Sequence, residues 1–362
     1  MITIDKVEEL LVKSSIEVSD IEFIPEGSNH QVFIITALGK KMICKFPIIR
    51  STETHGNLDT MFGGELSLER ETYLYQLSKS LGVPAPEFYA HISLDGYDFI
   101  LIELMKGMPL TKYIETSNFS KVQFLDVMKK LGSDFAKIQS INFNAYGNLI
   151  GHNKITPTNL FNFADRFIEI IDRRIERGIN KGAFTSEEVV LVEAFFHKRI
   201  NDFKPLLELK SKPATLVFTD MHADNFFVDE TGKPSGYFDL ESSQAAPAEL
   251  EFYGFRFFLF NYFDEETFQD AEKAFFSSYK AAGGKYAPTH EKDHELIDFL
   301  SACRLLELTE SYWGHRDGLR DLWAFKIKTL LMNYIFTLKV DYIGLSDIFR
   351  EKTKQPRSPK QD

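Results

Sequence analysis

The sequence predicts an α+β protein in which a small antiparallel-sheet unit, residues 1–105, precedes a larger and mainly helical unit, residues 106–345. The first part of the chain contains strand-like segments that are paired across short glycine-containing turns. Beyond Gly107 the apolar residues follow the spacing of long helices instead. Because strands and helices are segregated along the chain, the pattern is typical of α+β folds.

The beginning of the chain, residues 1–10, has a short amphipathic helical pattern and lacks the basic region and apolar stretch of a secretory signal. No apolar run approaches the ~20 residues that a membrane span requires. Cys44 and Cys303 are too few for a disulfide framework, and we expect both to be small buried side chains in a reducing compartment. These observations predict a cytoplasmic protein.

The composition is that of an ordinary globular chain, with 362 residues, 44% apolar and 26% charged, which is long enough for two cores. The formal net charge of -11 leaves no broad basic surface for nucleic-acid phosphates or an anionic membrane. We therefore expect neither nucleic acid nor membrane as a partner. The sequence indicates no oligomeric state.

The N-terminal unit contains two hairpin signals. Strand-like residues at 31–36 and 41–46 flank a turn at Gly39, and residues 87–92 and 97–104 flank the Asp95-Gly96 turn. A helical pattern at 65–81 lies between the two hairpins. This part is expected to form one small sheet with an internal helix.

The C-terminal unit contains helical patterns at 121–139, 159–177, 186–209 and 265–282, and two more reach about residue 340. Three brief strand-like runs, 214–218, 225–228 and 235–238, interrupt the helices. Residues 346–362 are polar and rich in charge and include prolines, so we expect a flexible tail.

The interrupting segment carries the polar residues of greatest interest. Asp220 is followed five residues later by Asn225, and Asp239 ends the next predicted strand. Transfer of a phosphoryl group needs a carboxylate that orients the attacking hydroxyl and oxygen ligands that hold magnesium against the phosphates. A tight loop would place the first two side chains together, and the following hairpin would return the third to the same mouth.

This spacing resembles the catalytic loop and metal-binding strand of the aminoglycoside phosphotransferase and choline kinase family of small-molecule kinases. The resemblance extends from about residue 21 to about residue 334. It implies a two-lobed protein-kinase-like fold with an N-terminal nucleotide-binding lobe and a helical lobe that holds the catalytic loop and acceptor site. It also implies ATP and Mg²⁺ as cofactors, Asp220 as the catalytic base, and Asn225 and Asp239 as magnesium ligands.

Lys45 lies at the centre of an apolar strand, where an unpaired ammonium would be costly to bury, so a partner is expected. The resemblance implies that Lys45 binds the α- and β-phosphates and that a glutamate on the next helix holds it. Glu71 is the best candidate for that glutamate. Glu69 remains the alternative, because the sequence does not fix the register.

Two further segments of the N-terminal unit resemble nucleotide-binding parts of the family. Gly27, Ser28 and Asn29 form a turn of small residues whose backbone N–H groups can approach phosphate oxygens. Glu103 and Met105 lie where the family has the interlobe hinge that hydrogen-bonds adenine.

The catalytic loop departs from the family pattern, which usually reads His-Gly-Asp. Phe218 and Thr219 stand before Asp220 here. Phe218 cannot hydrogen-bond through its side chain, and Thr219 restricts the backbone where glycine is usual. An alternative prediction is therefore a catalytically weak nucleotide-binding protein.

A second alternative comes from His290 and His294, which fit the H-E-x-x-H pattern of zinc hydrolases. The pattern lies at a polar helix start, and no third ligand is evident downstream. A solvated first turn explains these histidines as well, and zinc chemistry is the more remote hypothesis.

The acceptor is an alcohol that the sequence does not name, with an aminoglycoside or an amino alcohol as candidates from the resemblance. Asp224 and Glu241 lie in and near the catalytic segment, and Glu249 and Glu251 follow beside an aromatic stretch. Carboxylates around one mouth would attract a cation, and aromatic faces would add to that attraction. We therefore expect a cationic acceptor, although Glu249 and Glu251 also suit the start of a helix.

Overall fold

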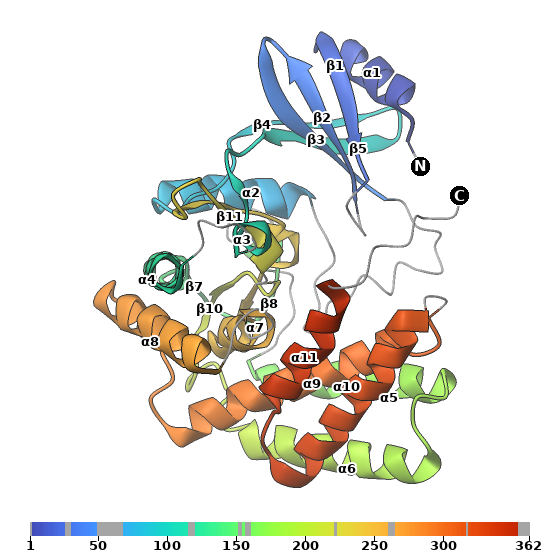
Figure 1. The fold of residues 1–362 in the computed structure, drawn as a ribbon, viewed down its shortest axis with the longest axis vertical. Helices are drawn as coiled ribbons and strands as arrows, with labels where there is room; N and C mark the ends of the chain where they lie inside the picture. Colours follow the sequence, from blue (N-terminus) through green and yellow to red (C-terminus); the bar gives the residue numbers. More distant parts are fainter. Residues whose placement is uncertain are drawn as a thin grey trace.

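The computed structural model describes residues 2–25, 30–48, 68–114, 120–150, 154–155, 161–220, 223–259, 265–315 and 318–353 (Figure 1). The N-terminal unit contains α1 (Ile4–Lys13), β1 (Val18–Ile24), β2 (His30–Ala37), β3 (Lys40–Pro47), α2 (Leu68–Ser80), β4 (Phe88–Leu94) and β5 (Tyr97–Glu103).

The remaining elements belong to the C-terminal unit. Its strands are β6 (Met108–Pro109), β7 (Asn142–Phe143), β8 (Gly147–Ile150), β9 (Lys154–Ile155), β10 (Ala214–Val217), β11 (Phe226–Val228), β12 (Pro234–Tyr237) and β13 (Gln244–Ala246). Its α-helices are α3 (Leu110–Ile114), α4 (Lys121–Ile138), α5 (Phe163–Asn180), α6 (Ser186–Phe203), α7 (Glu249–Leu259), α8 (Glu265–Ala281), α9 (Glu291–Tyr312), α10 (Gly318–Thr337) and α11 (Tyr342–Thr353), and the short 3₁₀ turns are η2 (Ala223–Asn225) and η3 (Leu240–Ser242).

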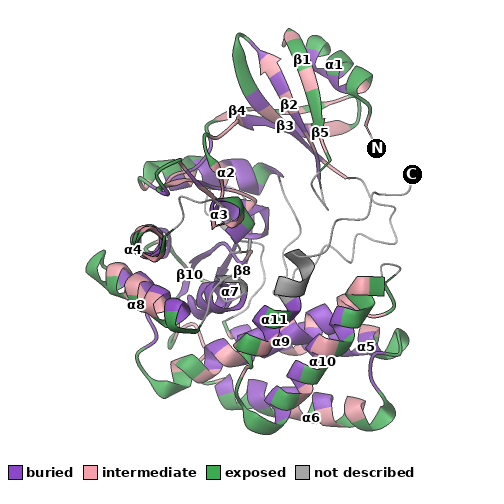
Figure 2. Cartoon of the chain, viewed as in Figure 1, coloured by how far each residue is buried: buried purple, intermediate pink, exposed green. Residues whose placement is uncertain are grey.

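The N-terminal sheet has the strand order β1-β2-β3-β5-β4, and every neighbouring pair is antiparallel. Both predicted hairpins are present, as β2–β3 and β4–β5. Side chains alternate across β5, because successive residues of a strand point to opposite faces. Phe99 and Leu101 pack with α1, whereas Ile100 and Ile102 join the core that contains α2. The middle of β5 is therefore buried on both faces of the sheet (Figure 2).

The C-terminal unit is built around α9, which α5, α7 and α10 contact (Figure 1). Helices α4 and α8 also pack together closely, and a side chain at Gly132 would clash with the carbonyl group of Phe275. The small strands form two sheets between these helices, with the orders β7-β10-β13-β8-β9 and β12-β11-β6. The three strand-like runs of the sequence correspond to β10, β11 and β12.

The end of the chain differs from the sequence prediction. A flexible tail from residue 346 is wrong for its first part, since α11 continues to Thr353. Leu345 and Ile348 are buried against the helical core, and this burial stabilises the helix beyond the predicted boundary. Residues 354–362 lie outside the described part of the chain.

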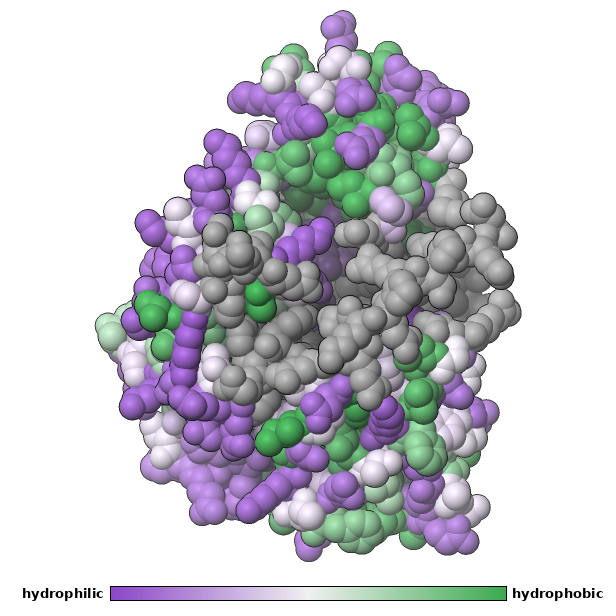
Figure 3. Space-filling view, in the orientation of Figure 1, coloured by the Kyte–Doolittle hydropathy of each residue, from purple (hydrophilic) through white to green (hydrophobic). Residues whose placement is uncertain are grey.

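The burial of the cysteines was expected from the sequence. Cys44 and Cys303 are both buried. On the face in Figure 3, hydrophilic side chains cover the region of α4 and α8, and hydrophobic ones gather over the N-terminal sheet. Within the described ranges, no helix is both long enough and apolar enough to cross a membrane.

Candidate active site

Lys45 on β3 pairs with Glu71 on α2. Its Nζ lies 3.0 Å from Oε1 and 2.9 Å from Oε2 of Glu71, and the two residues are 7% and 0% exposed. The hydroxyl of Tyr75 also donates to Glu71. Glu69 is exposed on the other side of α2, so the phase of the helix selects Glu71.

The same ammonium joins the N-terminal sheet to the C-terminal unit. Lys45 Nζ lies 2.8 Å from Oδ1 of Asp239 and 4.0 Å from Oε2 of Glu241. Burial by itself would lower the pKa of Lys45, but Asp239, Glu71 and Glu241 outweigh it and raise that pKa. Lys45 is therefore a fixed cation at the junction of the two units.

The catalytic loop leaves the buried strand β10 through a γ-turn. Asp220 N donates to Phe218 O at 2.8 Å, and the residue between them, Thr219, has a φ of 62°. A β-branched residue seldom adopts this left-handed geometry. The Thr219 hydroxyl donates to the carbonyl oxygen of Ser242 and contacts its Oγ, each at 3.0 Å. These contacts hold the threonine in the conformation that glycine usually supplies.

Phe218 takes an apolar role in place of the usual histidine. It is buried, and its ring centroid lies 5.8 Å from that of Phe135 and 6.4 Å from that of Tyr237. Its backbone N–H donates to Oε2 of Glu251 on α7 at 2.6 Å. The loop is thus anchored through core packing and through a carboxylate, without a side-chain hydrogen bond from residue 218.

Glu251 lies beneath the catalytic loop and is 0% exposed. Burial raises the pKa of Glu251 to about 8, against the lowering effect of hydrogen bonds from the backbone of Phe218 and Thr219; the nearby charge of Asp220 raises it further. The sequence suggested an acceptor-attracting role for this glutamate, whereas the structure places it in the support of the loop.

The raised pKa of Glu251 predicts a pH-dependent stability. The unfolded chain ionises this group near its ordinary pKa of 4.5 and the folded chain near 8, so stability falls as pH rises between these values. Glu251→Gln keeps an oxygen that accepts from Phe218 N and removes this ionisation. We expect the variant to gain Tm relative to wild type between pH 5 and pH 8.5 in thermal melts, by no more than about 2–4 °C for each kcal/mol gained in the free energy of unfolding.

The exposed Glu230→Gln on the β11–β12 turn serves as the control and should show no such gain. Parallel pH curves for wild type and Glu251→Gln would rule out this titration.

Hydrogen bonds with backbone groups tie Asn225 to the Asp220 loop and to Phe238, the residue before Asp239. Asn225 Nδ2 donates to Asp220 O at 2.9 Å, and Phe238 N donates to Asn225 O at 3.0 Å. The amide of Asn225 is thereby oriented, and its Oδ1 remains as the acceptor atom. Asp239 has a φ of 57°, and its side chain is 42% exposed. Amide and carboxylate oxygens suit magnesium, so these residues fit the predicted ion.

His30 is a member of the site that the sequence did not single out. Its Nε2 lies 3.0 Å from Oε2 of Glu241, and both side chains are buried. His30, Asp239 and Glu241 are also the one group of metal-capable side chains found within the described residues. His30 directly follows Gly27, Ser28 and Asn29 of the predicted phosphate-binding turn, which lie outside the described residues.

Arg70 on α2 holds the backbone of Glu241. Arg70 NH1 donates to the carbonyl oxygen of Glu241 at 2.6 Å, and Arg70 Nε donates to Leu149 O at 2.6 Å. The side chain of Glu241 turns toward Lys45 and His30. The acceptor-binding role expected for Glu241 from the sequence stays a prediction.

The segment that joins the two units, residues 103–107, makes close contacts on both sides. Glu103 N donates to Glu87 O at 2.8 Å, and Oε2 of Glu103 accepts from Glu87 N at 3.1 Å, so this side chain is tied to the start of β4. Met105 lies against Gly236 of β12. Gly107 has a φ of 104°, and a Cβ there would lie 2.1 Å from Val228 O. Only glycine lets the chain pass β11 at this distance.

The carboxylates that predicted a cationic acceptor do not share a surface. Asp224 is exposed and accepts from the Thr111 hydroxyl on α3. Glu249 is buried and pairs with Lys212. Glu251 lies under the loop, as described above. Glu249 and Glu251 are therefore buried away from any acceptor surface, and the cationic acceptor itself stays a prediction.

His290 and His294 do not form a metal centre with a third ligand among the described residues. His290 is the N-cap of α9, and Nδ1 of His294 lies 2.6 Å from the guanidinium of Arg256. Because a guanidinium only donates, Nδ1 of His294 accepts and Nε2 carries the ring proton, which leaves neither nitrogen open to zinc in this arrangement. The zinc hypothesis receives no support from this arrangement.

Comparison with known proteins shows which family and which solved structures the chain is similar to. A model of the phosphotransferase enzyme family matches residues 20–295. No curated protein shows a significant match. A thermostable mutant of aminoglycoside phosphotransferase APH(4)-Ia, solved with AMP-PNP and hygromycin B, is 13% identical, with a TM-score of 0.57 over 96% of this chain and 99% of that chain.

Two other solved structures are similar. Macrolide 2'-phosphotransferase type I has a TM-score of 0.55 and 10% identity, over 89% of this chain and 96% of that chain. Spectinomycin phosphotransferase APH(9)-Ia, solved with ADP and spectinomycin, has a TM-score of 0.52 and 14% identity, over 93% and 98%. At these identities the likeness concerns the fold, and it confirms the predicted two-lobed kinase-like architecture.

Proposed function

The chain belongs to the phosphotransferase enzyme family, and we propose that it transfers the γ-phosphoryl group of ATP to a hydroxyl group of a small molecule. One observation carries this proposal above the others. Lys45, held by Glu71, reaches the same hairpin end that brings Asp239 and Asn225 beside the Asp220 loop. The residues proposed to bind phosphate, to bind metal and to act as the base thus belong to neighbouring segments, which supports the proposal.

In the proposed reaction, the Asp220 carboxylate accepts the proton of the acceptor hydroxyl as its oxygen attacks the γ-phosphorus. Lys45 neutralises negative charge on the phosphates. Asn225 and Asp239 would hold magnesium, which when bound neutralises phosphate charge and aligns the phosphates. Glu71 acts by positioning Lys45.

The nucleotide would lie between the two units, with residues 1–105 as the nucleotide-binding part and residues 106–345 as the acceptor part. Because Glu103 N is already bonded to Glu87 O, the Glu103 carbonyl group and the Met105 N–H are the groups proposed to bind adenine. Gly27, Ser28 and Asn29 would cover the phosphates.

The alternative of a catalytically weak nucleotide-binding protein came from Phe218 and Thr219. The γ-turn and the Glu251 anchor favour an ordered loop, so they support transfer over mere binding. An aminoglycoside or an amino alcohol, expected from the sequence, remains among the acceptors to be tested.

The test is a coupled assay of ADP release with and without Mg²⁺ across hydroxylated compounds, including aminoglycosides, amino alcohols and sugars. We expect magnesium-dependent ADP formation that increases with at least one acceptor and yields a phosphorylated product by mass spectrometry. Thermal stabilisation by ATP and Mg²⁺ without ADP formation on any acceptor would favour the weak binder.

A further inference from the structure

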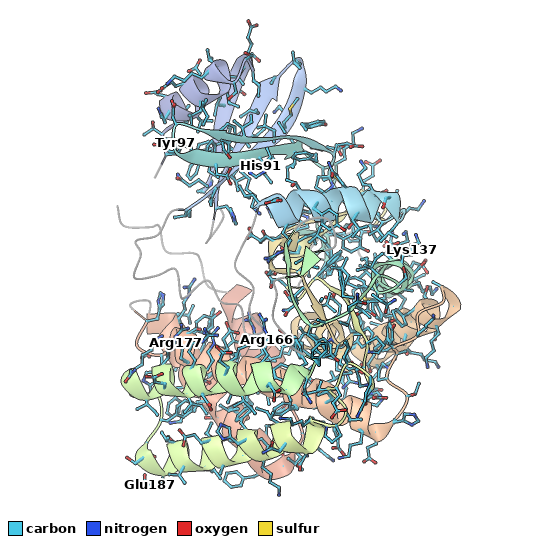
Figure 4. All side chains as sticks on the ribbon, turned by 180° about the vertical axis from the view of Figure 1, so that it is seen from behind. His91, Tyr97, Lys137, Arg166, Arg177 and Glu187 are labelled. Atoms are coloured by element: carbon cyan, nitrogen blue, oxygen red, sulfur yellow. The ribbon has the colours of Figure 1, made fainter. Side chains whose placement is uncertain are left out.

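The contact of His30 with Glu241 differs from an ordinary histidine–carboxylate pair. On the edge strand β4, Nε2 of His91 lies 2.9 Å from Oδ1 of Asp98, and the two atoms share a hydrogen bond (Figure 4). Nε2 of His30 lies 3.0 Å from Oε2 of Glu241, yet this oxygen has no hydrogen bond with any residue that the structure describes. The contact therefore has the length of a hydrogen bond without its direction.

Oε2 of Glu241 is also not satisfied by Lys45. His30 is 8% exposed and Glu241 is 3% exposed, so neither side chain is open to water. The ammonium of Lys45 lies 4.0 Å from Oε2 of Glu241, which is beyond hydrogen-bonding distance. Its three N–H donors match the three shorter contacts, two with Glu71 and one with Asp239. A buried carboxylate oxygen in this position is costly unless another cation binds it.

The fold explains why a histidine reaches this oxygen. His30 begins β2, and Val32, two residues further on, pairs with Lys45 of β3. His30 and Lys45 therefore lie on the same face of the sheet. Glu241 lies in η3, two residues after Asp239. One side chain of the N-terminal unit thus meets two carboxylates of the C-terminal unit.

The spacing of these groups suits a shared metal ion. One ligand atom from each of His30, Asp239 and Glu241 lies within 4.8 Å of the others. Two ligands that meet at a right angle, each about 2.1 Å from an ion, lie about 3.0 Å apart. This is the separation of Nε2 and Oε2. In such an arrangement the ion lies on the axis of the nitrogen lone pair and the oxygen lies beside that axis, which also explains the missing hydrogen bond.

We propose that His30, Asp239 and Glu241 bind a divalent ion of the first transition series, such as Mn²⁺ or Co²⁺, through Nε2 and one oxygen of each carboxylate. Imidazole nitrogen is a ligand for transition metals, whereas Mg²⁺ is bound by oxygen. The proposal goes beyond the function proposed above, because it assigns a ligand role to His30 and selects a different class of ion. Asp239 belongs to both sets of ligands.

The test measures ion binding to the full chain after a chelator has removed metal, without nucleotide or acceptor. Co²⁺ binding is followed by visible absorption, which reports a nitrogen ligand, and Mn²⁺ binding by the loss of the electron paramagnetic resonance signal of the free ion. Mg²⁺ is added in large excess as a competitor. The variants are His30→Gln and Glu241→Gln. His91→Gln is the matched control, since it removes a histidine that contacts a carboxylate in the same sheet.

We expect a single Co²⁺ or Mn²⁺ ion per chain, which Mg²⁺ does not displace. His30→Gln and Glu241→Gln should each weaken binding about tenfold or more, since even the loss of a group that supports a ligand commonly costs this much. The nitrogen contribution to the Co²⁺ spectrum should disappear in His30→Gln and remain in Glu241→Gln, a difference that general destabilisation would not produce. His91→Gln should bind as wild type does.

The proposal is overturned if the metal-free chain binds neither ion, if Mg²⁺ displaces the bound ion, or if folded His30→Gln binds Co²⁺ with wild-type affinity and spectrum. Electron spin-echo modulation of the wild-type chain with Mn²⁺ detects a coordinated histidine nitrogen. Its absence overturns the proposal even where a variant fails to fold. The result is separate from the test of phosphoryl transfer, because a chain that releases no ADP can still bind Co²⁺ through His30.

Discussion

Asp220→Asn is expected to lower kcat by about 10²- to 10⁴-fold, the usual contribution of a positioned general base. The substitution keeps the size of the side chain and removes the carboxylate that would accept the hydroxyl proton. Lys45, Glu71 and Asp239 make their own contacts and do not depend on Asp220. Affinity for AMP-PNP with Mg²⁺ should therefore change by about twofold or less. ADP release measures the first effect and calorimetry the second.

Asp224→Asn is the matched control, since it removes a carboxylate from the same loop. Asp224 is exposed and contacts Thr111 on α3, so we expect kcat within about threefold of wild type. Equal kcat for wild type and Asp220→Asn would reject Asp220 as the base. A comparable loss in both variants would indicate that any charge change in the loop disturbs it.

The strands and long helices were predictable because each follows its own spacing over enough residues. The hairpins β2–β3 and β4–β5 and the helices α4, α6 and α8 lie close to their predicted ranges. Helix α7 was indicated only by Glu249 and Glu251, which suit a helix start, because the helix is apolar on most sides and shows no single periodic face. Strands such as β7 and β13 are too short to give a pattern.

The candidate site was predictable only as far as sequence spacing decides it. Asp220, Asn225 and Asp239 lie on one loop and its following hairpin, so their proximity follows from local structure. The contact of His30 with Glu241 depends on how the two units pack together, and no motif near either residue in the sequence predicts it.

The direction of a charged side chain was the least predictable property. Glu249 and Glu251 are close to the catalytic segment in sequence, yet both are buried in internal contacts.

Asp239→Ala is expected to remove the magnesium-dependent part of nucleotide binding and to lower kcat/KM for ATP by about 10²- to 10³-fold, as loss of a charge-stabilising group commonly does. Its carboxylate ends the hairpin beside Asn225 and carries the negative charge that a cation needs. Lys45 keeps Glu71 as a partner in the variant, so the fold and a magnesium-independent contact with the phosphates should persist. Calorimetry with AMP-PNP, with and without Mg²⁺, separates these two contributions.

Glu230→Gln, an exposed acid on the turn of the same hairpin, controls for a general change of charge and should retain the full effect of Mg²⁺. Circular dichroism establishes that Asp239→Ala is folded. If the folded variant gains as much AMP-PNP affinity from Mg²⁺ as wild type does, Asp239 is not a magnesium ligand. In that case its ion pair with Lys45 is the functional contact, because the loss would then appear equally with and without the metal.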